Sequence, residues 1–295
     1  PRLAAHYDAI AMNEALFERV KQVYNSRAAQ RLTGDELRLT EKMYEDFVRS
    51  GALLSAEDKA SLQQINEQLS ALSVKFGQNV LAETNAFTLE VDLTDLDGLP
   101  TSVRDAAREQ AKSMGKGDKY IFTLQKPSML PLLTYADNRN LREQIYKAYI
   151  ARGNNDNEND NKDIIVKTMQ LRVEKAHLFG YTNPADYILA DCMAHDAKTV
   201  DAFLESVWGP SLKAAKREAA ELQKMMDKDL PGEKLQPWDW WYYAEKLRVE
   251  KYALNEEELK PYFELNNVRK GAFGLANKLF GLNFEKLENM PVYNP

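Results

Sequence analysis

The sequence predicts a mainly helical protein that carries one small β element. Several long segments place apolar residues three or four positions apart, the spacing that lines one face of a helix. Only residues 86–133 depart from this spacing and include runs that alternate apolar and polar residues. Apolar residues make up 44% and charged residues 28% of the 295 residues. This balance is typical of a globular protein with a substantial core.

The clearest helical pattern runs through residues 62–80. Its apolar positions are Leu62, Ile65, Leu69, Leu72, Phe76 and Val80. Ser55, followed by Glu57 and Asp58, predicts the start of this helix, because serine caps helix N-termini and acids are favoured beside them. The same spacing recurs at residues 141–149, 165–176, 200–208 and 268–279.

The β element is predicted between residues 86 and 133. Residues 86–100 alternate apolar and polar side chains until Gly98 and Pro100 end the run. Residues 119–133 begin with β-prone side chains and continue into two prolines. We interpret these segments as two strands, paired antiparallel, with a short helix from Ser102 to Met114 between them.

Composition argues against two classes of partner. The net charge is −6, and no Lys/Arg-rich tract with interleaved aromatic residues appears, so nucleic acid is not expected. No apolar run approaches the roughly 18 residues of a membrane helix, so no membrane partner is expected either. Cys192 is the only cysteine, which excludes an internal disulfide and fits the cytoplasm. The periplasm is the alternative, because the true N-terminus, where a signal peptide would lie, is expected to be missing.

The sequence offers no complete catalytic or metal-binding set. None of His6, His177 and His195 belongs to a His-Glu-x-x-His pattern, so no zinc ligand is predicted within the chain. A packed or capping histidine is favoured for His177, and a loop or helix-cap role is favoured over a catalytic dyad for His195 beside Asp196. Cys192 has no base among its sequence neighbours, so an inert thiol is favoured over a nucleophile.

The polar segment 154–163 partly resembles a calcium-binding loop. Asp156, Glu158 and Asp160 alternate as early calcium ligands do. The glycine that should follow is missing, and Lys167 stands where the bidentate Glu belongs. We therefore predict a solvated connection between two helices.

Three short motifs and two longer segments carry a family resemblance. The motifs are Trp238-Asp239-x-x-Tyr242-Tyr243, Lys260-Pro261-Tyr262-Phe263 and Leu279-Phe280-Gly281-Leu282. The longer segments are LTYADNRNLREQIYKAYIARG (133–153) and LRVEKAHLFGYTNPADYILADCMA (171–194). In this order and spacing, they resemble the M3 family of zinc metallopeptidases, the thimet oligopeptidase-like and neurolysin-like group. The bacterial peptidyl-dipeptidase branch is the nearest pattern.

The resemblance implies that this chain is part of a larger enzyme. Members carry His-Glu-x-x-His and a downstream Glu, which this sequence lacks, so a catalytic zinc domain is expected C-terminal of residue 295. Residues 1–295 would then be a helical N-terminal lobe, one wall of a channel that admits short peptides. The full-length parent would bind zinc and release C-terminal dipeptides, with internal cleavage as the alternative. The lobe alone would be inactive and would self-associate through the face exposed by the missing lobe.

The aromatic stretch 237–248 leaves two interpretations open. Pro237 suits the first turn of a helix, and Asp239 suits its positive end. A helix this aromatic on several sides should be largely buried, as part of the core. The alternative, implied by the resemblance, is a direct contact to a substrate peptide by Asp239, Tyr242 or Tyr243.

Two other functions remain open from the sequence alone. A non-catalytic helical module could hold peptides or a partner helix in an aromatic-lined groove. A helical scaffold without a ligand is the third hypothesis. Peptide hydrolysis by the full-length parent discriminates the enzyme from both.

Overall fold

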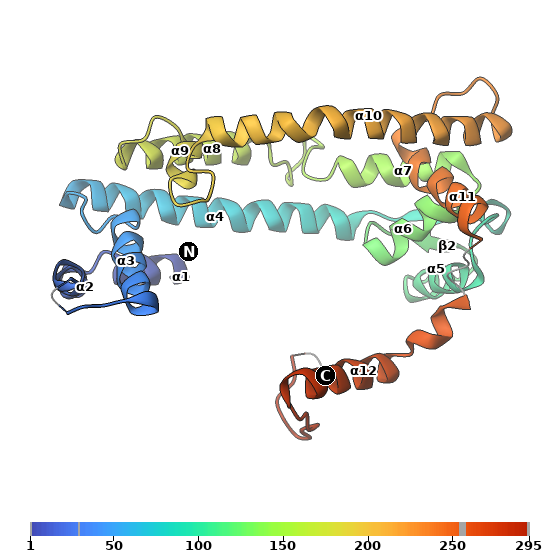
Figure 1. Cartoon of the computed structure of the whole chain (residues 1–295). Helices are drawn as coiled ribbons and strands as arrows, with labels where there is room; N and C mark the ends of the chain where they lie inside the picture. The colour runs from blue at the N-terminus through green and yellow to red at the C-terminus, as the bar shows by residue number, and fades with distance from the viewer. Residues whose placement is uncertain (1, 29, 254–257, 294–295) are drawn as a thin grey trace. The chain divides into compact units, whose positions relative to one another are not determined.

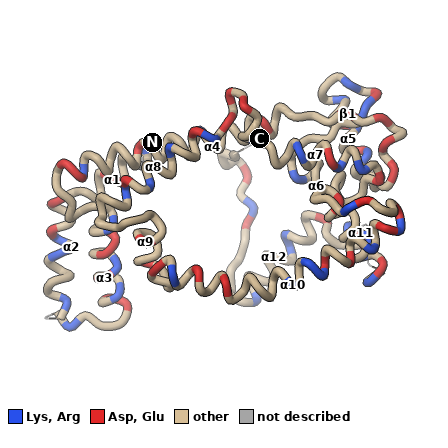
Figure 2. The backbone as a smooth tube through the Cα atoms, turned by 90° about the horizontal axis from the view of Figure 1, so that it is seen from above, with Lys and Arg blue, Asp and Glu red and all other residues tan. Residues whose placement is uncertain are grey.

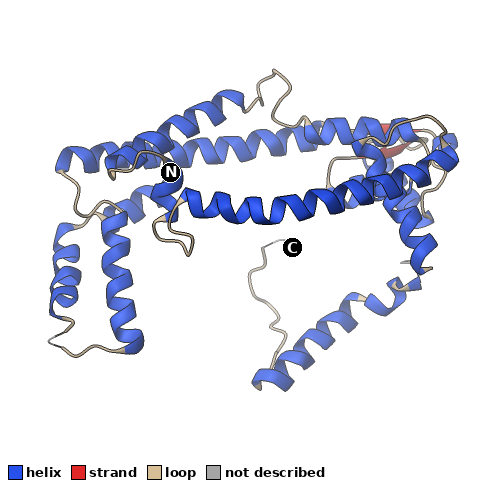
Figure 3. Cartoon of the chain, turned by 45° about the horizontal axis from the view of Figure 1, so that its top comes forward, coloured by secondary structure: helices blue, strands red, loops and turns tan. Residues whose placement is uncertain are grey.

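The computed structural model describes residues 2–28, 30–253 and 258–293, and helices dominate it (Figure 3). The chain divides into two compact units, residues 1–242 and residues 243–295. The predicted mainly helical fold with a small β element is confirmed (Figure 1). Whether residues 1–295 form the N-terminal lobe of a larger peptidase stays a proposal.

The first unit begins with four helices. They are α1 (Arg2–Ala11), α2 (Glu14–Ser26), α3 (Gly34–Arg49) and α4 (Ala56–Ala86). Ser55 caps α4 as predicted, since its side-chain oxygen accepts a hydrogen bond from the backbone N–H of Asp58 at 3.1 Å. Leu62 and Ile65 of the predicted apolar face are buried, whereas Phe76 is 40% exposed. The second half of α4 instead buries Asn79 and Glu83.

The β element organises the main hydrophobic core. Strands β1 (Leu89–Val91) and β2 (Tyr120–Phe122) pair antiparallel, with Leu89 opposite Phe122. Helix α5 (Thr101–Ser113) lies between them in sequence and packs on β2. The core cluster consists of Leu89, Val91, Leu96, Leu99, Ala107, Phe122, Leu124, Met129, Leu132, Leu133, Ala136, Leu141 and Ile145. Two antiparallel strands with a helix between them are therefore confirmed, although β1 takes only Leu89–Val91 of the predicted run 86–100.

The second predicted strand is shorter than residues 119–133 suggested. It ends at Phe122, and helix α6 (Lys126–Tyr135) takes the remaining residues, including both prolines. Pro127 lies in the first turn, where no N–H is needed, and Pro131 lies one turn later. Burial of Met129, Leu132 and Leu133 stabilises this helix despite Pro131.

The polar segment after helix α7 (Arg139–Ile150) is more than a solvated connection. Glu83 is 8% exposed, and its carboxylate accepts hydrogen bonds from the backbone N–H of Gly153 and the side chains of Asn155 and Asn157. Asn79 donates a hydrogen bond to Asn161 Oδ1 at 2.9 Å. The segment is thereby tied to α4, although its outer residues remain exposed.

A lysine lies between the acids that resemble calcium ligands. Lys162 Nζ is 2.6 Å from Asp156 Oδ1 and 2.8 Å from Asp160 Oδ2. The hydrogen bond from Lys162 lowers the pKa of Asp160 to about 2. The described residues hold no group of three or more His, Cys, Asp or Glu side chains placed to bind a metal ion.

Helices α8, α9 and α10 follow α7 in the first unit. Helix α8 (Lys162–Leu178) packs along α4, and α9 (Pro184–Leu189) follows it. Helix α10 (Ala197–Asp229) leads through a loop to the 3-10 helix η2 (Pro237–Asp239). Acidic and basic residues are interspersed along the described part of the chain (Figure 2). No helix among the described residues combines the length and apolarity needed to cross a membrane.

Most described residues of the second unit are exposed. Helix α11 (Trp240–Tyr252) crosses the boundary between the units, and η4 (Lys260–Phe263) and α12 (Leu265–Phe280) follow. Gly281 ends α12 with φ 68, the left-handed conformation that glycine adopts readily. None of the described residues 258–293 is buried.

Candidate functional site

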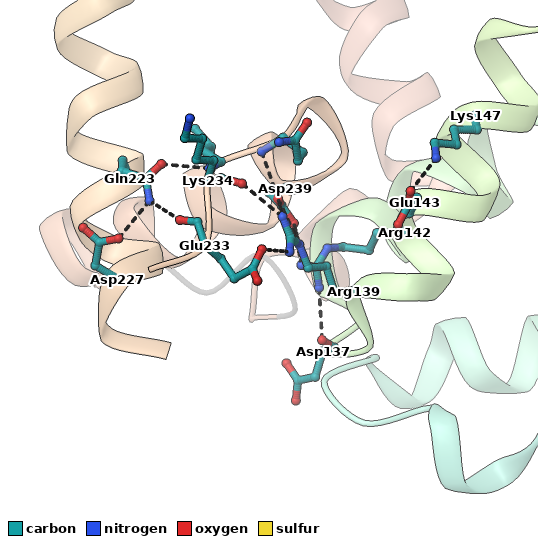
Figure 4. Close-up of polar contacts among 12 residues, drawn as sticks. Asp137, Arg139, Arg142, Glu143, Lys147, Gln223, Asp227, Glu233, Lys234 and Asp239 are labelled. Carbon is teal, nitrogen blue, oxygen red and sulfur yellow. Dashed lines mark hydrogen bonds and ion pairs between the residues drawn. The ribbon is translucent and has the colours of Figure 1, made fainter. Parts of the chain in front are cut away.

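Asp239 is the centre of a buried ion-pair cluster between η2 and α7 (Figure 4). Its side chain is 0% exposed and pairs with Arg139 and Arg142, both from the first turn of α7. The distances are 2.9 Å from Arg139 Nη2 to Asp239 Oδ2 and 3.0 Å from Arg142 Nη2 to Asp239 Oδ1. We call these three residues the Asp239 clasp.

The Asp239 clasp also fixes the start of η2 and the loop before it. The backbone N–H of Gln236 donates to Asp239 Oδ2 at 3.0 Å, which forms one half of a capping box. Arg139 reaches Glu233 Oε2 and the carbonyl oxygen of Lys234, both at 3.1 Å. The hydrogen bond to Asp239 raises the pKa of Arg139, so this guanidinium stays charged. Both carboxylate oxygens of Asp239 are therefore engaged within the chain.

Arg142 is the most deeply buried cation of the clasp. It is 1% exposed and donates to the carbonyl oxygens of Ala136 and Asp137 at 2.6 and 3.1 Å. Its guanidinium carbon also lies 4.1 Å from the ring centroid of Tyr242. A buried guanidinium needs several partners, because each unpaired donor is left without water. The two Nη atoms of Arg142 have such partners, whereas its buried Nε has none among the described residues.

Tyr242 joins the clasp to a second acid. Its hydroxyl donates to Asp137 Oδ1 at 2.7 Å, and its side chain is 7% exposed. Asp137 precedes α7, whose N-cap is Asn138. The first turn of α7 thus holds η2 through Asp239 and the start of α11 through Tyr242.

The tryptophans around the clasp are less buried than predicted. Trp238 and Trp241 each lie 6.3 Å from the Tyr146 ring, measured between centroids. Trp240 is 37% and Trp241 40% exposed, so the expectation that this helix is buried on several sides was wrong for these two. Their polar-edged rings tolerate partial exposure at a boundary between apolar packing and solvent.

The structure brings two of the three predicted site residues together. Asp239 and Tyr242 meet around Arg142. Tyr243, the first residue of the second unit, is 1% exposed and has Lys246 Nζ 5.8 Å from its ring centroid. All three side chains are buried and contact other residues of the chain, as the core-packing interpretation expects. A direct peptide contact by Asp239, Tyr242 or Tyr243 stays a prediction.

Sequence reasoning missed Arg139 and Arg142 as partners of Asp239. The signal was present, since two arginines three positions apart lie on one face of a helix. What the sequence did not indicate was the partner, which lies 100 residues from Arg139 and 97 from Arg142. Glu83 was missed for the same reason, since its partners lie 70 to 74 residues away.

The histidines and the cysteine lie in separate places. His6 is in α1 and His177 in the last turn of α8. Cys192 is exposed, and His195 adopts φ 65 in the loop before the α10 N-cap. A zinc ion needs at least three side-chain ligands in a catalytic site. The described residues do not provide them, so no zinc site is placed among these residues.

A surface cavity of about 530 Å³ lies between α3 and the loop before α10. Arg38, Arg49, Asp191 and His195 are among its lining residues. Asp191 is neutralised by Lys42, whose Nζ is 2.6 Å from its Oδ2, and this hydrogen bond lowers the pKa of Asp191. The lining thus combines two arginines, Arg38 and Arg49, with two acids, Glu45 and Asp191.

Comparison with known proteins gives a consistent set of relatives. Residues 132–295 match the family described as Peptidase family M3. The chain is 36% identical to a dipeptidyl carboxypeptidase of Salmonella typhimurium, over 99% of this chain and 43% of that protein. It is 34% identical to organellar oligopeptidase A of Arabidopsis thaliana, over 100% of this chain and 40% of that protein. It is 30% identical to oligopeptidase A of Escherichia coli, over 100% and 44%.

The chain therefore spans less than half of the length of these relatives. The motif-bearing segments 133–153, 171–194 and 237–282 all lie within the matched residues 132–295. The matched range also includes every residue of the Asp239 clasp.

Proposed function

Because the chain belongs to peptidase family M3, we propose that it is part of a zinc-dependent oligopeptidase that hydrolyses short peptides and releases C-terminal dipeptides. The observation that supports the reaction class is the match of residues 132–295 to this family. The 36% identity to a dipeptidyl carboxypeptidase supports dipeptide release over internal cleavage. Oligopeptidases at 30% to 34% identity keep internal cleavage as the alternative subclass.

In this proposal the zinc chemistry belongs to a part of the polypeptide outside these 295 residues. The sequence contains no His-Glu-x-x-His, the pattern that supplies two zinc ligands and a general base on one helix. When bound there, zinc would polarise the scissile carbonyl and activate water. The 295-residue chain is accordingly proposed to be inactive alone.

The proposed contribution of this chain is one wall of the substrate channel. A wall that selects substrates by size must hold its shape, and the Asp239 clasp supports this role. It ties α7 to η2 through buried charges, and the hydrogen bond from Tyr242 to Asp137 adds the start of α11. Substitution of a clasp residue is therefore proposed to act on peptide binding through position, in addition to any direct contact.

A direct peptide contact is best tested at the tyrosines. Tyr242→Phe and Tyr243→Phe remove one hydroxyl each and keep the buried rings. If the hydroxyl binds peptide, the full-length variant shows a raised KM at an unchanged unfolding midpoint. If the Tyr242 hydroxyl serves only the hydrogen bond to Asp137, the Tyr242→Phe variant loses stability while its KM stays unchanged. The same pair of results for Tyr243→Phe would show that the Tyr243 hydroxyl does not bind peptide.

The proposed partner of this chain is the remainder of the M3 polypeptide. Residues 258–293 support this, because none of them is buried and many are large and apolar. Examples are Tyr262, 77% exposed, and Phe280, 73% exposed. Apolar surface of this extent is normally covered by a partner or another domain. We propose the cytoplasm as compartment, which the single exposed Cys192 fits, with the periplasm as the alternative.

Peptide hydrolysis by the full-length protein tests the function. Products are read by mass spectrometry, with and without a metal chelator, and the 295-residue chain serves as the inactive reference. Chelator-sensitive loss of two-residue units from the C-terminus is expected. Internal cleavage would keep the family and change the subclass. No cleavage by a folded, metal-loaded protein would contradict the enzyme and favour a peptide-binding module.

A further inference from the structure

The middle of helix α10 carries large apolar side chains that stay exposed. Phe203 and Trp208 are each 66% exposed, and Leu204 is 53% exposed. Every residue from 201 to 213 is exposed. In Figure 2, no other helix among the described residues 2–242 lies along this part of α10.

Both ends of α10 contact other parts of the first unit, whereas the middle of the helix is exposed. At the first end, the backbone N–H of Ala197 donates to Asp186 Oδ1 of α9 at 3.2 Å. Near the C-terminal end of the helix, Leu222, Met225 and Met226 are buried. No residue of α10 before Leu222 is buried. A span of exposed helix therefore connects two packed ends.

This span is a poor helix by its own sequence. It contains Gly209 and Pro210, the two residue types least compatible with a helix interior. Isolated helices of this length are marginal in water even with favourable residues. Packing on the apolar face must therefore contribute to keeping the span helical in the functional protein.

The width of the apolar face indicates what covers it. Val200, Leu204 and Val207 lie along its centre, and Phe203 and Leu212 lie at its edges. At 3.6 residues per turn the face covers roughly half of the helix circumference. A pair of helices buries a narrower seam than this, so a second α10 would leave the edges in water. A layer of several helices from a folded domain would cover the whole face.

We propose that the part of the M3 polypeptide outside these 295 residues packs on this face of α10. The inference rests on the proposed function, that the chain is part of a longer peptidase. The chain covers 43% of the dipeptidyl carboxypeptidase relative, so more than half of that protein's length is available to supply a helical layer. The docking face is defined as Val200, Phe203, Leu204, Val207, Trp208 and Leu212.

Hydrogen–deuterium exchange tests the docking face directly. Amides 200–212 are compared in the full-length protein and in the 295-residue chain, at a concentration where light scattering gives a monomer. At least roughly tenfold slower exchange in the full-length protein is expected. Equal rates would overturn the inference. Protection already present in the monomeric chain would overturn it in favour of a cover from within residues 1–295. Protection that disappears on dilution of the full-length protein would overturn it in favour of a second copy.

Paired variants provide an independent test. The double variant Phe203→Ser/Trp208→Ser changes the docking face, and Lys213→Ser/Arg217→Ser changes exposed residues on the opposite face of the same helix. The first should leave the Tm of the 295-residue chain unchanged and lower that of the full-length protein by at least about 3 °C. The control should change neither. A lowered Tm of the chain, or an unchanged Tm of the full-length protein, would contradict the inference.

Peptide hydrolysis, measured on the same preparations, separates this inference from the proposed function. A full-length protein that protects α10 and cleaves no peptide contradicts the function alone. One that cleaves peptides while residues 200–212 exchange freely contradicts the inference alone.

Discussion

At the scale of single residues, buried ion pairs hold together segments that are far apart in the sequence. Helix propensity, a local property, does not specify such contacts. Asp239, 0% exposed, holds two arginines of α7, and Arg142 is itself 1% exposed. Removing one partner of such a pair leaves the other charged in a site without water. The same logic holds at Glu83, where one carboxylate supplies acceptors for three donors of the segment after α7.

Asp239→Asn is expected to destabilise the first unit by roughly 3–5 kcal/mol, because it leaves the Arg142 charge buried and unpaired. Glu233→Gln is the matched control, since Glu233 binds the same Arg139 but its side chain is 59% exposed. The control should cost less than about 1 kcal/mol. Urea unfolding followed by circular dichroism measures both. Equal effects of the two variants would show that the clasp does not stabilise the unit.

The hydrogen bonds to Glu83 predict a dependence of stability on acid pH. Burial alone would raise the pKa of Glu83, but hydrogen bonds from Asn155, the Gly153 N–H and Asn157 outweigh it, so the pKa is lowered from 4.5. A lowered folded-state pKa stabilises the fold above the unfolded value, and this contribution is lost as pH falls through the folded value. The loss therefore lies below about pH 4.5.

Glu83→Gln should flatten this pH dependence. Its unfolding midpoint is expected to lie below that of the unchanged protein at pH 6 and to approach it as the pH falls below 4.5. Glu67→Gln, at an exposed position of the same helix, is the control and should preserve the original slope. Urea unfolding between pH 2 and pH 6 gives the comparison. A parallel shift of the Glu83→Gln curve at all pH values would contradict the assignment.

At the scale of elements, the turn at Gly98 allows the chain to approach the segment between α6 and α7 closely. Gly98 has φ +82, and a Cβ there would overlap the carbonyl oxygen of Tyr135 and the side chain of Asp137. The close approach is held by a hydrogen bond from the Asp137 N–H to the Asp97 oxygen at 2.9 Å. Because Asp137 also accepts a hydrogen bond from the Tyr242 hydroxyl, this turn supports the residues next to the clasp.

Gly98→Ala is expected to destabilise the first unit by roughly 2 kcal/mol or more, through backbone strain and steric overlap. Gly77→Ala is the matched control, since Gly77 lies inside α4 with no atom within 4 Å of the added Cβ. It should stabilise the unit by about 0.5–1 kcal/mol, because alanine favours helix more than glycine does. Thermal unfolding of both variants shows whether the signs differ as expected. The same sign for both would contradict the local account.

At the scale of the whole molecule, apolar surface without cover is the dominant property of the second unit. Residues 258–293 bury none of their side chains, although α12 has a clear apolar face that ends in Leu279 and Phe280. Aromatic rings pair within the unit, as Phe273 and Phe284 do at 4.1 Å between centroids. Such local pairs do not replace a core.

The 295-residue chain alone is therefore expected to self-associate at high concentration. Light scattering over a concentration series should give a mass above that of the monomer, and Leu279→Ser/Phe280→Ser should shift the series toward monomer. Asn277→Ser is not suitable as a control, because Asn277 bonds to Leu282 and Asn283. Lys286→Ser, at an exposed charged residue, is the control. A monomer at all concentrations would contradict the expectation.

The sequence by itself determined the mainly helical class, several of the helices, the position of the two short strands and the family. Helical spacing, the Ser55 cap and the alternating runs near residues 86 and 120 are local effects, and local effects can be read from neighbouring residues. The tertiary structure alone decided which buried charges meet, since Asp239 lies about a hundred positions from its arginines. It also decided which apolar faces are covered. The faces of α4 near Leu62 and of α10 near Trp208 follow the same spacing, and only the first is buried. Periodicity shows that a helix has an apolar face, whereas its burial depends on which segments the fold brings to that face.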